Sequence, residues 1–124
     1  MSSAKTPEDL SRLFVELANN RDADGMAALY EEDAVLAFPP GQETVGRAAI
    51  REVMAQLVAA GGTFTVERAM PTVCHGDLAL TSTVPSDNTG GRVQIVRRQA
   101  DGSWLRVIDR PEIRSAQAQP QPPA

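Results

Sequence analysis

Residues 29–41 read LYEEDAVLAFPPG and residues 45–62 read VGRAAIREVMAQLVAAGG, and these two runs decide the fold. The first run predicts the end of a helix and then a short strand over residues 34–38, which two prolines close because proline lacks a backbone donor. The second predicts a helix over residues 47–60, followed by paired glycines that enter the left-handed conformation without steric cost. Its apolar residues recur at the spacing of one helix face: Ile50, Val53, Met54 and Leu57.

The chain on either side of these runs completes the pattern. Thr6 and Pro7 predict a helix start, with a hydroxyl cap and proline at the first helical position. An apolar stripe follows: Leu10, Leu13, Phe14, Leu17 and Ala18. Asp22 or Asp24 predicts the cap of a short second helix that carries Met26, Leu29 and Tyr30. Beyond Gly62 the composition favours strands, which we expect over residues 63–70, 72–74, 78–84, 92–98 and 104–110.

This order of elements predicts an α+β domain in which a strongly curved, mostly antiparallel sheet is packed by three N-terminal helices around a pocket. A length of 124 residues fits one domain. We expect that domain to span residues 1–112. Residues 113–124 are rich in Pro, Gln and Ala, and a segment of that composition is expected to be disordered.

Bulk properties exclude several classes of function. A net charge of −4 and a sequence pI near 4.9 disfavour a nucleic-acid partner, which requires clustered Lys and Arg. The single cysteine cannot form an intrachain disulfide or a cysteine-based zinc cluster. No run approaches the roughly 18 apolar residues of a membrane span, and the first ten residues lack the apolar block of a secretory signal. We therefore expect a soluble, cytoplasmic protein without metal, cofactor, nucleic-acid or membrane partner.

With this layout the chain resembles the nuclear-transport-factor-two-like superfamily, in its ketosteroid-isomerase-like and polyketide-cyclase-like (SnoaL-like) branch. The resemblance spans roughly residues 7–111 and is specific for the fold rather than for one activity. It implies a cone-shaped α+β domain and a homodimer formed through the outer face of the sheet. The matching segments are residues 29–35, Pro39 with Gly41, residues 46–50, residues 99–104 and residues 108–111.

The steroid isomerases of this branch use a tyrosine on the first helix, an aspartate base after the first strand and an aspartic acid on a later strand. The resemblance places these positions at Phe14, Phe38 and Gln94 of this chain. A phenyl ring can neither donate a hydrogen bond to a developing oxyanion nor accept a proton. The resemblance therefore predicts the fold and pocket of this branch with a different chemistry, and it predicts that the protein is not a steroid isomerase.

Asp109 is the leading candidate for that chemistry. Alternation along the last strand puts Leu105, Val107 and Asp109 on one face, and the resemblance turns this face toward the cavity. A carboxylate at the end of an apolar stripe could serve as a general acid or base. The alternative from the residues alone is an ion pair with Arg92, Arg98 or Arg110 at the sheet edge, or a register in which Trp104 and Ile108 are buried instead.

Other residues are candidates for binding. Gln94 could orient a carbonyl, and Arg98 could bind a carboxylate, although a solvated or interfacial arginine is the commoner case. We expect the remaining pocket wall to consist of Phe14, Tyr30, Phe38, Met54, Val96 and Val107, with the Tyr30 hydroxyl at the pocket mouth. His75 lies in a predicted turn where exposure is the default, and Cys74 has no base placed for it. Thr81 and Thr83 are predicted to point outward, at the dimer interface.

Two hypotheses follow. The first is a cofactor-independent enzyme of secondary metabolism, of the cyclase, isomerase, dehydratase or epoxide hydrolase type, that acts through Asp109 and Gln94 on a small apolar, oxygenated molecule. The second is a non-catalytic module that binds an apolar ligand or dimerises. A buried aspartate is costly without a use, which favours the enzyme.

Overall fold

The computed structural model describes residues 3–84 and 90–113. Three helices come from the first half of the chain: α1 (Asp9–Asn19), α2 (Ala23–Ala27) and α3 (Arg47–Ala59). The strands found in the described part are β1 (Tyr30–Leu36), β2 (Thr44–Val45), β3 (Arg68–Ala69), β4 (Val73–His75), β5 (Leu78–Val84), β6 (Gly91–Arg98) and β7 (Trp104–Ile113). The α+β class predicted from the sequence is confirmed.

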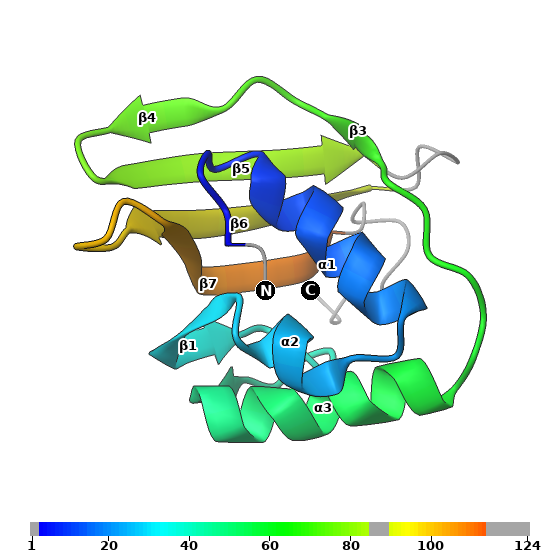
Figure 1. Ribbon diagram of the computed structural model, residues 1–124. Coiled ribbons are helices and arrows are strands. Elements are labelled where there is room, and N and C mark those ends of the chain that lie inside the picture. The colour runs from blue at the N-terminus through cyan, green and yellow to red at the C-terminus, as the bar shows by residue number, and fades with distance from the viewer. Residues whose placement is uncertain (1–2, 85–89, 114–124) are drawn as a thin grey trace, which may run out of the picture.

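These strands form a single sheet in the order β2-β1-β7-β6-β5-β3, with β4 paired to β5. Strands β1 and β7 run parallel, and the other pairs are antiparallel. The helices gather on one face of this curved sheet: α1 passes across β5 to β7, while α2 and α3 lie beyond β1 (Figure 1). The core between them contains fully buried side chains from both layers, including Leu10, Met26, Tyr30, Ile50 and Val96.

The two N-terminal helices differ in their bounds from the prediction. The first begins at Asp9 rather than at Pro7. The Asp9 carboxylate accepts hydrogen bonds from the backbone N–H groups of Lys5 and Thr6, and residues 7–8 form a turn before the helix. The second helix ends at Ala27, so Leu29 and Tyr30 do not belong to it. Tyr30 instead opens β1, because this part of the chain enters a parallel ladder with β7 in which Tyr30 pairs with Arg106. Asp22 caps the second helix through Gly25 N–H.

A β-bulge in β7 overturns the predicted alternation of that strand. Ile95 pairs with Ile108 while Val96 pairs with Arg106, so Val107 has no partner across the ladder. An extra residue in one strand shifts all later side chains to the opposite face. Trp104 and Arg106 are therefore buried before the bulge, and Asp109 is buried after it. The prediction that Leu105 and Val107 share the inner face with Asp109 is wrong.

The predicted faces of β5 are also reversed. Thr81 and Thr83 were expected to point outward, but both are buried, and they alternate with Leu78 and Leu80, which are 36 % and 40 % exposed. The outer face instead carries an apolar row that crosses neighbouring strands in register, since Leu80 pairs with Ile95 and Ile95 pairs with Ile108. Ile108 points outward as predicted and is 45 % exposed.

Residues 61–67 connect α3 to the sheet without regular structure, although a strand was predicted over 63–70. Gly61 and Gly62 both have positive φ, 83° and 93°, as expected at the end of a helix. Side chains hold the segment beside α1. The Asn19 amide donates to Phe64 O at 2.9 Å and accepts from Phe64 N at 2.8 Å, and Arg21 Nη2 donates to Gly62 O at 2.6 Å.

The last strand continues to Ile113, one residue past the predicted end of the domain. Residues 114–124 of the predicted tail and residues 85–89, between two of the predicted strands, lie outside the described residues. Of the helices in the described chain, none has the length and hydropathy that crossing a lipid bilayer demands.

Candidate functional site

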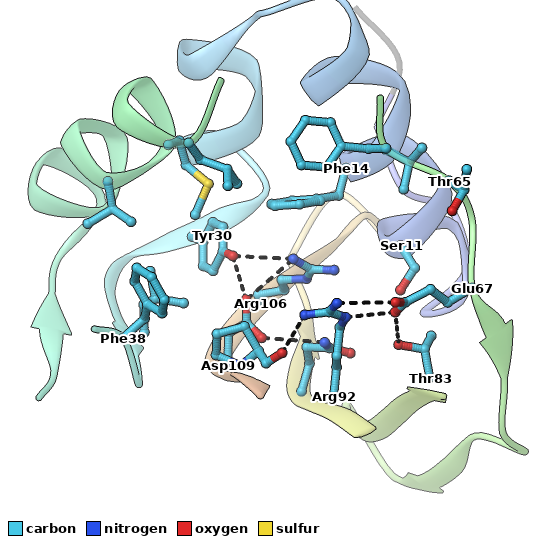
Figure 2. Close-up of a pocket in the computed structure, with 18 of the residues that line it drawn as sticks. Ser11, Phe14, Tyr30, Phe38, Thr65, Glu67, Thr83, Arg92, Arg106 and Asp109 are labelled. Carbon is cyan, nitrogen blue, oxygen red and sulfur yellow. Dashed lines mark hydrogen bonds and ion pairs between the residues drawn. The ribbon is translucent and has the colours of Figure 1, made fainter. Parts of the chain in front are cut away.

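A pocket of about 410 Å³ lies between the helices and the inner face of the sheet. Its walls are largely apolar, and its polar side chains come mainly from β5, β6 and β7 and from the 61–67 segment. The apolar walls include Phe14, Leu36, Phe38, Val53, Met54 and Phe64. Seven of the polar side chains form two clusters, which Figure 2 shows side by side across the pocket, and Ser11, Thr63 and Thr65 also line it. A concave, apolar cavity with a few placed polar groups is the usual form of a small-molecule site.

The first cluster, here called the Asp109 cluster, consists of Tyr30, Gln94, Arg106 and Asp109. The Tyr30 hydroxyl donates to Asp109 Oδ2 at 2.5 Å. Tyr30 is fully buried, so its hydroxyl lies inside the protein and not at the pocket mouth as predicted. Its backbone is fixed from the other side, because Arg47 at the start of α3 donates from Nε and Nη2 to Tyr30 O at 2.9 and 2.7 Å.

Arg106 supplies the positive charge of the cluster. Its Nη1 lies 3.2 Å from the Tyr30 hydroxyl and 3.5 Å from Asp109 Oδ2. The guanidinium lies between two rings, with its central carbon 4.8 Å from the Phe14 ring centre and 5.6 Å from that of Tyr30. A cation over the face of an aromatic ring is attracted by the ring quadrupole. Phe14, which cannot donate a hydrogen bond itself, thus serves as a platform for a side chain that can.

Burial and neighbouring charges shift the pKa values of Tyr30 and Arg106. Burial raises the pKa of Tyr30 far above its ordinary value, and the nearby Asp109 carboxylate raises it further, so this phenol stays protonated. Burial alone would lower the pKa of Arg106, but Tyr30 and Asp109 raise it above its usual value. Arg106 Nε has no hydrogen-bond partner within the described residues, which is an energetic cost of placing this cation in the interior.

The two oxygens of Asp109 have different surroundings. Oδ2 is contacted by both Tyr30 and Arg106, whereas Oδ1 has a single long contact, 3.4 Å, with Gln94 Nε2. Gln94 is oriented by Thr81, whose hydroxyl donates to Gln94 Oε1 at 2.8 Å, so that the amide nitrogen is turned toward Asp109. Oδ1 is therefore the carboxylate oxygen with the most remaining capacity to accept a hydrogen bond or a proton.

The second cluster, here called the Glu67 cluster, consists of Glu67, Arg92 and Thr83. Arg92 donates from Nε to Glu67 Oε1 at 2.7 Å and from Nη2 to Glu67 Oε2 at 3.2 Å, in a fork geometry. Its Nη1 donates to Pro111 O at 2.5 Å. The Thr83 hydroxyl adds a bond to Glu67 Oε1 at 3.1 Å. The cluster ties the irregular 61–67 segment to the sheet.

Six of the sequence-predicted site residues line the pocket, and three do not. Phe14, Tyr30, Phe38, Met54, Gln94 and Asp109 line it. Val96 is fully buried in the core but lies outside the pocket lining. Val107 is displaced by the bulge, and Arg98 pairs with Asp77 at 2.6 Å while lying over the Trp104 ring. The structure therefore does not bring Val96, Arg98 and Val107 into the lining of this pocket.

Cys74 and His75 are exposed on β4, away from the pocket lining. Within the described residues, no group of three or more His, Cys, Asp or Glu side chains is arranged to hold a metal ion.

Sequence reasoning missed Arg106 and Glu67. Period-two alternation assigned Arg106 to the outer face, and only the bulge at Val107 places it in the pocket together with Asp109. A bulge of this kind leaves no composition signal in β7. Glu67 was not predicted as a site residue because the composition of residues 63–70 favoured a strand. Nothing in that composition indicated that this segment would line the pocket.

The family model of the SnoaL-like domain matches residues 11–114. The chain therefore belongs to the SnoaL-like domain family, of the nuclear-transport-factor-two-like superfamily. None of the curated proteins matches the chain significantly.

Solved structures agree on the fold. A protein from Thiobacillus denitrificans, provisionally assigned to the calcium/calmodulin-dependent protein kinase type II association domains, matches with a TM-score of 0.69 at 20 % identity over 91 % of this chain and 100 % of its own. A ketosteroid isomerase-like protein from Erwinia carotovora atroseptica matches with a TM-score of 0.67 at 20 % identity, over 83 % and 89 % of the two chains. A nuclear-transport-factor-two-like protein with a cystatin-like fold from Novosphingobium aromaticivorans matches with a TM-score of 0.61 at 22 % identity, over 90 % of this chain and 82 % of its own.

Proposed function

We propose that this protein is an enzyme that performs acid–base chemistry, without a cofactor, on a small apolar molecule carrying a carbonyl or epoxide oxygen. The observation that carries the proposal is the buried Asp109 carboxylate at the wall of an apolar pocket, with Oδ2 engaged and Oδ1 nearly uncommitted. A carboxylate in that position can accept a proton from a bound molecule.

The proposed reaction uses the two oxygens of Asp109 for different tasks. Tyr30 and Arg106 hold Oδ2 and thereby fix the plane of the carboxylate. Oδ1 accepts a proton from a carbon next to a substrate carbonyl, or from a water molecule that attacks an epoxide. The negative charge that develops on the substrate oxygen is stabilised by the donors beside it, Arg106 and Gln94. Return of the proton from Oδ1 to a different carbon atom of the substrate completes an isomerisation. In the epoxide reaction the C–O bond of the ring breaks as water adds, and the proton held on Oδ1 passes to the opened oxygen to give a diol.

Steroid isomerisation is not part of this proposal. Phe38 lines the pocket where the resemblance puts the isomerase base, and Phe14 contacts Arg106 where it puts the phenolic donor. Neither ring can transfer a proton. We expect turnover of a standard ketosteroid substrate to remain at buffer background, and measurable isomerisation would contradict this assignment of the two positions.

The alternative function is a non-catalytic module that binds an apolar ligand. One observation favours it: Arg106 already compensates the charge of Asp109, so the pair could serve only to satisfy buried groups. The two functions differ in whether a bound ketone exchanges its protons.

Deuterium exchange tests the proposal without knowledge of the natural substrate. A panel of small cyclic and aryl ketones is incubated with the protein in D₂O, and exchange next to the carbonyl is followed by NMR; epoxides are incubated in ¹⁸O-labelled water. We expect at least one compound to react faster than in buffer, and Asp109→Asn to abolish the reaction. Asp33→Asn, which changes an exposed carboxylate on β1, is the matched control. Ligands that bind in the pocket but never exchange or hydrolyse would favour the binding module.

A further inference from the structure

We propose that Glu67 forms a second subsite of the same pocket, which accepts a hydrogen bond from a hydroxyl group at the far end of the substrate. This inference rests on the proposed function for the other end, where Asp109 accepts the proton and Arg106 and Gln94 stabilise the reacting oxygen. It assigns the substrate to a class: neutral, elongated, apolar molecules with a carbonyl or epoxide at one end and a hydroxyl at the other.

The positions of the two clusters on β6 set the spacing. Arg92 of the Glu67 cluster and Gln94 of the Asp109 cluster are two residues apart on β6, and both line the pocket. Two strand residues span roughly 7 Å. Thr83 is the direct partner of Arg92 on β5, and Figure 2 shows Glu67, Thr83 and Arg92 together on one side, with Tyr30 on the other.

Hydrogen-bond accounting shows which chemistry the Glu67 cluster offers. Each nitrogen of Arg92 is engaged, two with Glu67 and one with Pro111 O, and the Thr83 hydroxyl donates to Glu67. Within the described residues, Glu67 Oε1 accepts two bonds but Oε2 accepts only one, at 3.2 Å. A carboxylate has about four acceptor positions. Arg92 uses three of its five N–H groups, so the cluster can donate as well as accept. The free position on Glu67 Oε2 matches a donor on the ligand, and a hydroxyl group can both fill it and accept from Arg92.

Charge decides which donor fits. Glu67 and Arg92 form a balanced pair, and so do Asp109 and Arg106. A ligand carboxylate would face Glu67 without a free cation, and a ligand ammonium would lie close to the Arg92 guanidinium. A hydroxyl donates to Glu67 Oε2 and leaves both pairs neutral, so it is the donor that the cluster accepts at the lowest electrostatic cost.

Three aryl ketones that differ only at the far end test the inference: para-hydroxybenzylacetone, its para-methoxy ether and its para-carboxylate. Dissociation constants are measured by NMR titration for the full chain, Glu67→Gln and the control Glu43→Gln, an exposed glutamate. We expect the wild-type protein to bind the hydroxyl compound about tenfold more tightly than the ether, the size of one hydrogen bond to a charged group, and to bind the carboxylate most weakly. The preference should vanish in Glu67→Gln and persist in Glu43→Gln.

The outcomes separate this inference from the proposed function. Equal wild-type affinity for the hydroxyl compound and the ether, with exchange of their carbonyl-adjacent protons, would overturn the Glu67 subsite and leave the Asp109 chemistry standing. A hydroxyl preference without any exchange would support the subsite and contradict the enzyme. Failure of all three compounds to bind would overturn the subsite together with the pocket assignment. If Glu67→Gln does not fold, the affinities of the wild-type protein for the hydroxyl compound and the ether still test the Glu67 subsite.

Discussion

Arg106 and Asp109 lie three residues apart on β7, and both side chains point into the pocket. In a regular strand, residues three apart face opposite sides of the sheet. The bulge at Val107 removes this conflict and brings a cation and a carboxylate within 3.5 Å of each other in the interior. The chemistry of the pocket thus depends on one extra residue in one strand.

This buried pair leads to a prediction about stability. Removing one partner leaves an uncompensated charge in the interior, so Arg106→Met and Asp109→Leu should each lower the free energy of unfolding by about 3–5 kcal/mol. The double variant should lose much less than the sum, because no charge then remains buried. Chemical denaturation of the four proteins measures this cycle. Strict additivity would show that the two groups do not interact.

A pH titration provides a second prediction. The chain has a single tyrosine, so the change in ultraviolet absorbance that accompanies tyrosinate formation reports Tyr30 alone. Burial, and then the Asp109 charge, raise the pKa of Tyr30, whereas in the unfolded chain it ionises near pH 10. The folded state therefore keeps a proton that the unfolded state loses, and the stability from Tyr30 is complete below about pH 10 and falls above it.

We expect the tyrosinate signal to appear only when the protein unfolds in alkali, at the same pH as the loss of circular dichroism. A tyrosinate signal near pH 10 in a protein that keeps its circular dichroism would contradict the buried position of this hydroxyl.

The sequence predicted the layout of the domain better than its site. The helix over 47–60 and the strand over 78–84 were recognisable because their apolar spacing and their closing turns agree with each other, and the structure places α3 and β5 there. Asp109 was singled out, but through an alternation that the strand does not follow. Its actual partners come from elsewhere: Tyr30 was read as part of a helix, and Arg106 was assigned to the outer face.

These failures have a common physical origin. The face of a β-strand residue depends on every position before it, so one bulge reverses the faces of all residues that follow. The switch of Tyr30 from helix to strand depends on pairing with Arg106, which is 76 residues later in the chain. Neither effect is encoded in local periodicity.

The Asn19 side chain supports a third prediction, about the 61–67 segment. Asn19 makes two hydrogen bonds to the backbone of Phe64, in the manner of a neighbouring strand. Asn19→Ala removes both, and because the site is exposed we expect a loss of about 1 kcal/mol in the free energy of unfolding. Asn20→Ala changes the adjacent exposed asparagine and serves as the control in the same denaturation experiment. Equal effects of the two substitutions would show that the Asn19 bonds contribute nothing.

The outer face of the sheet carries the last prediction. We propose that the protein is a homodimer that buries this face, as the family resemblance implies. Leu80, Ile95 and Ile108 form a row across three neighbouring strands, and two of them are 40 % and 45 % exposed. An apolar row of this kind, outside the pocket, suits a two-fold self-contact.

Light scattering at micromolar concentration should give twice the chain mass of 13.3 kDa. Leu80→Glu places a charge in the row, at its β5 end, and should return the protein to one chain mass with its circular dichroism unchanged. Val66→Glu alters an equally apolar residue on the 61–67 segment, outside the sheet, which is 61 % exposed, and should leave the dimer intact. A wild-type mass of 13.3 kDa would refute the dimer. A dimer that survives Leu80→Glu would place the contact on another surface, because a charge buried without a partner inside an apolar interface is costly.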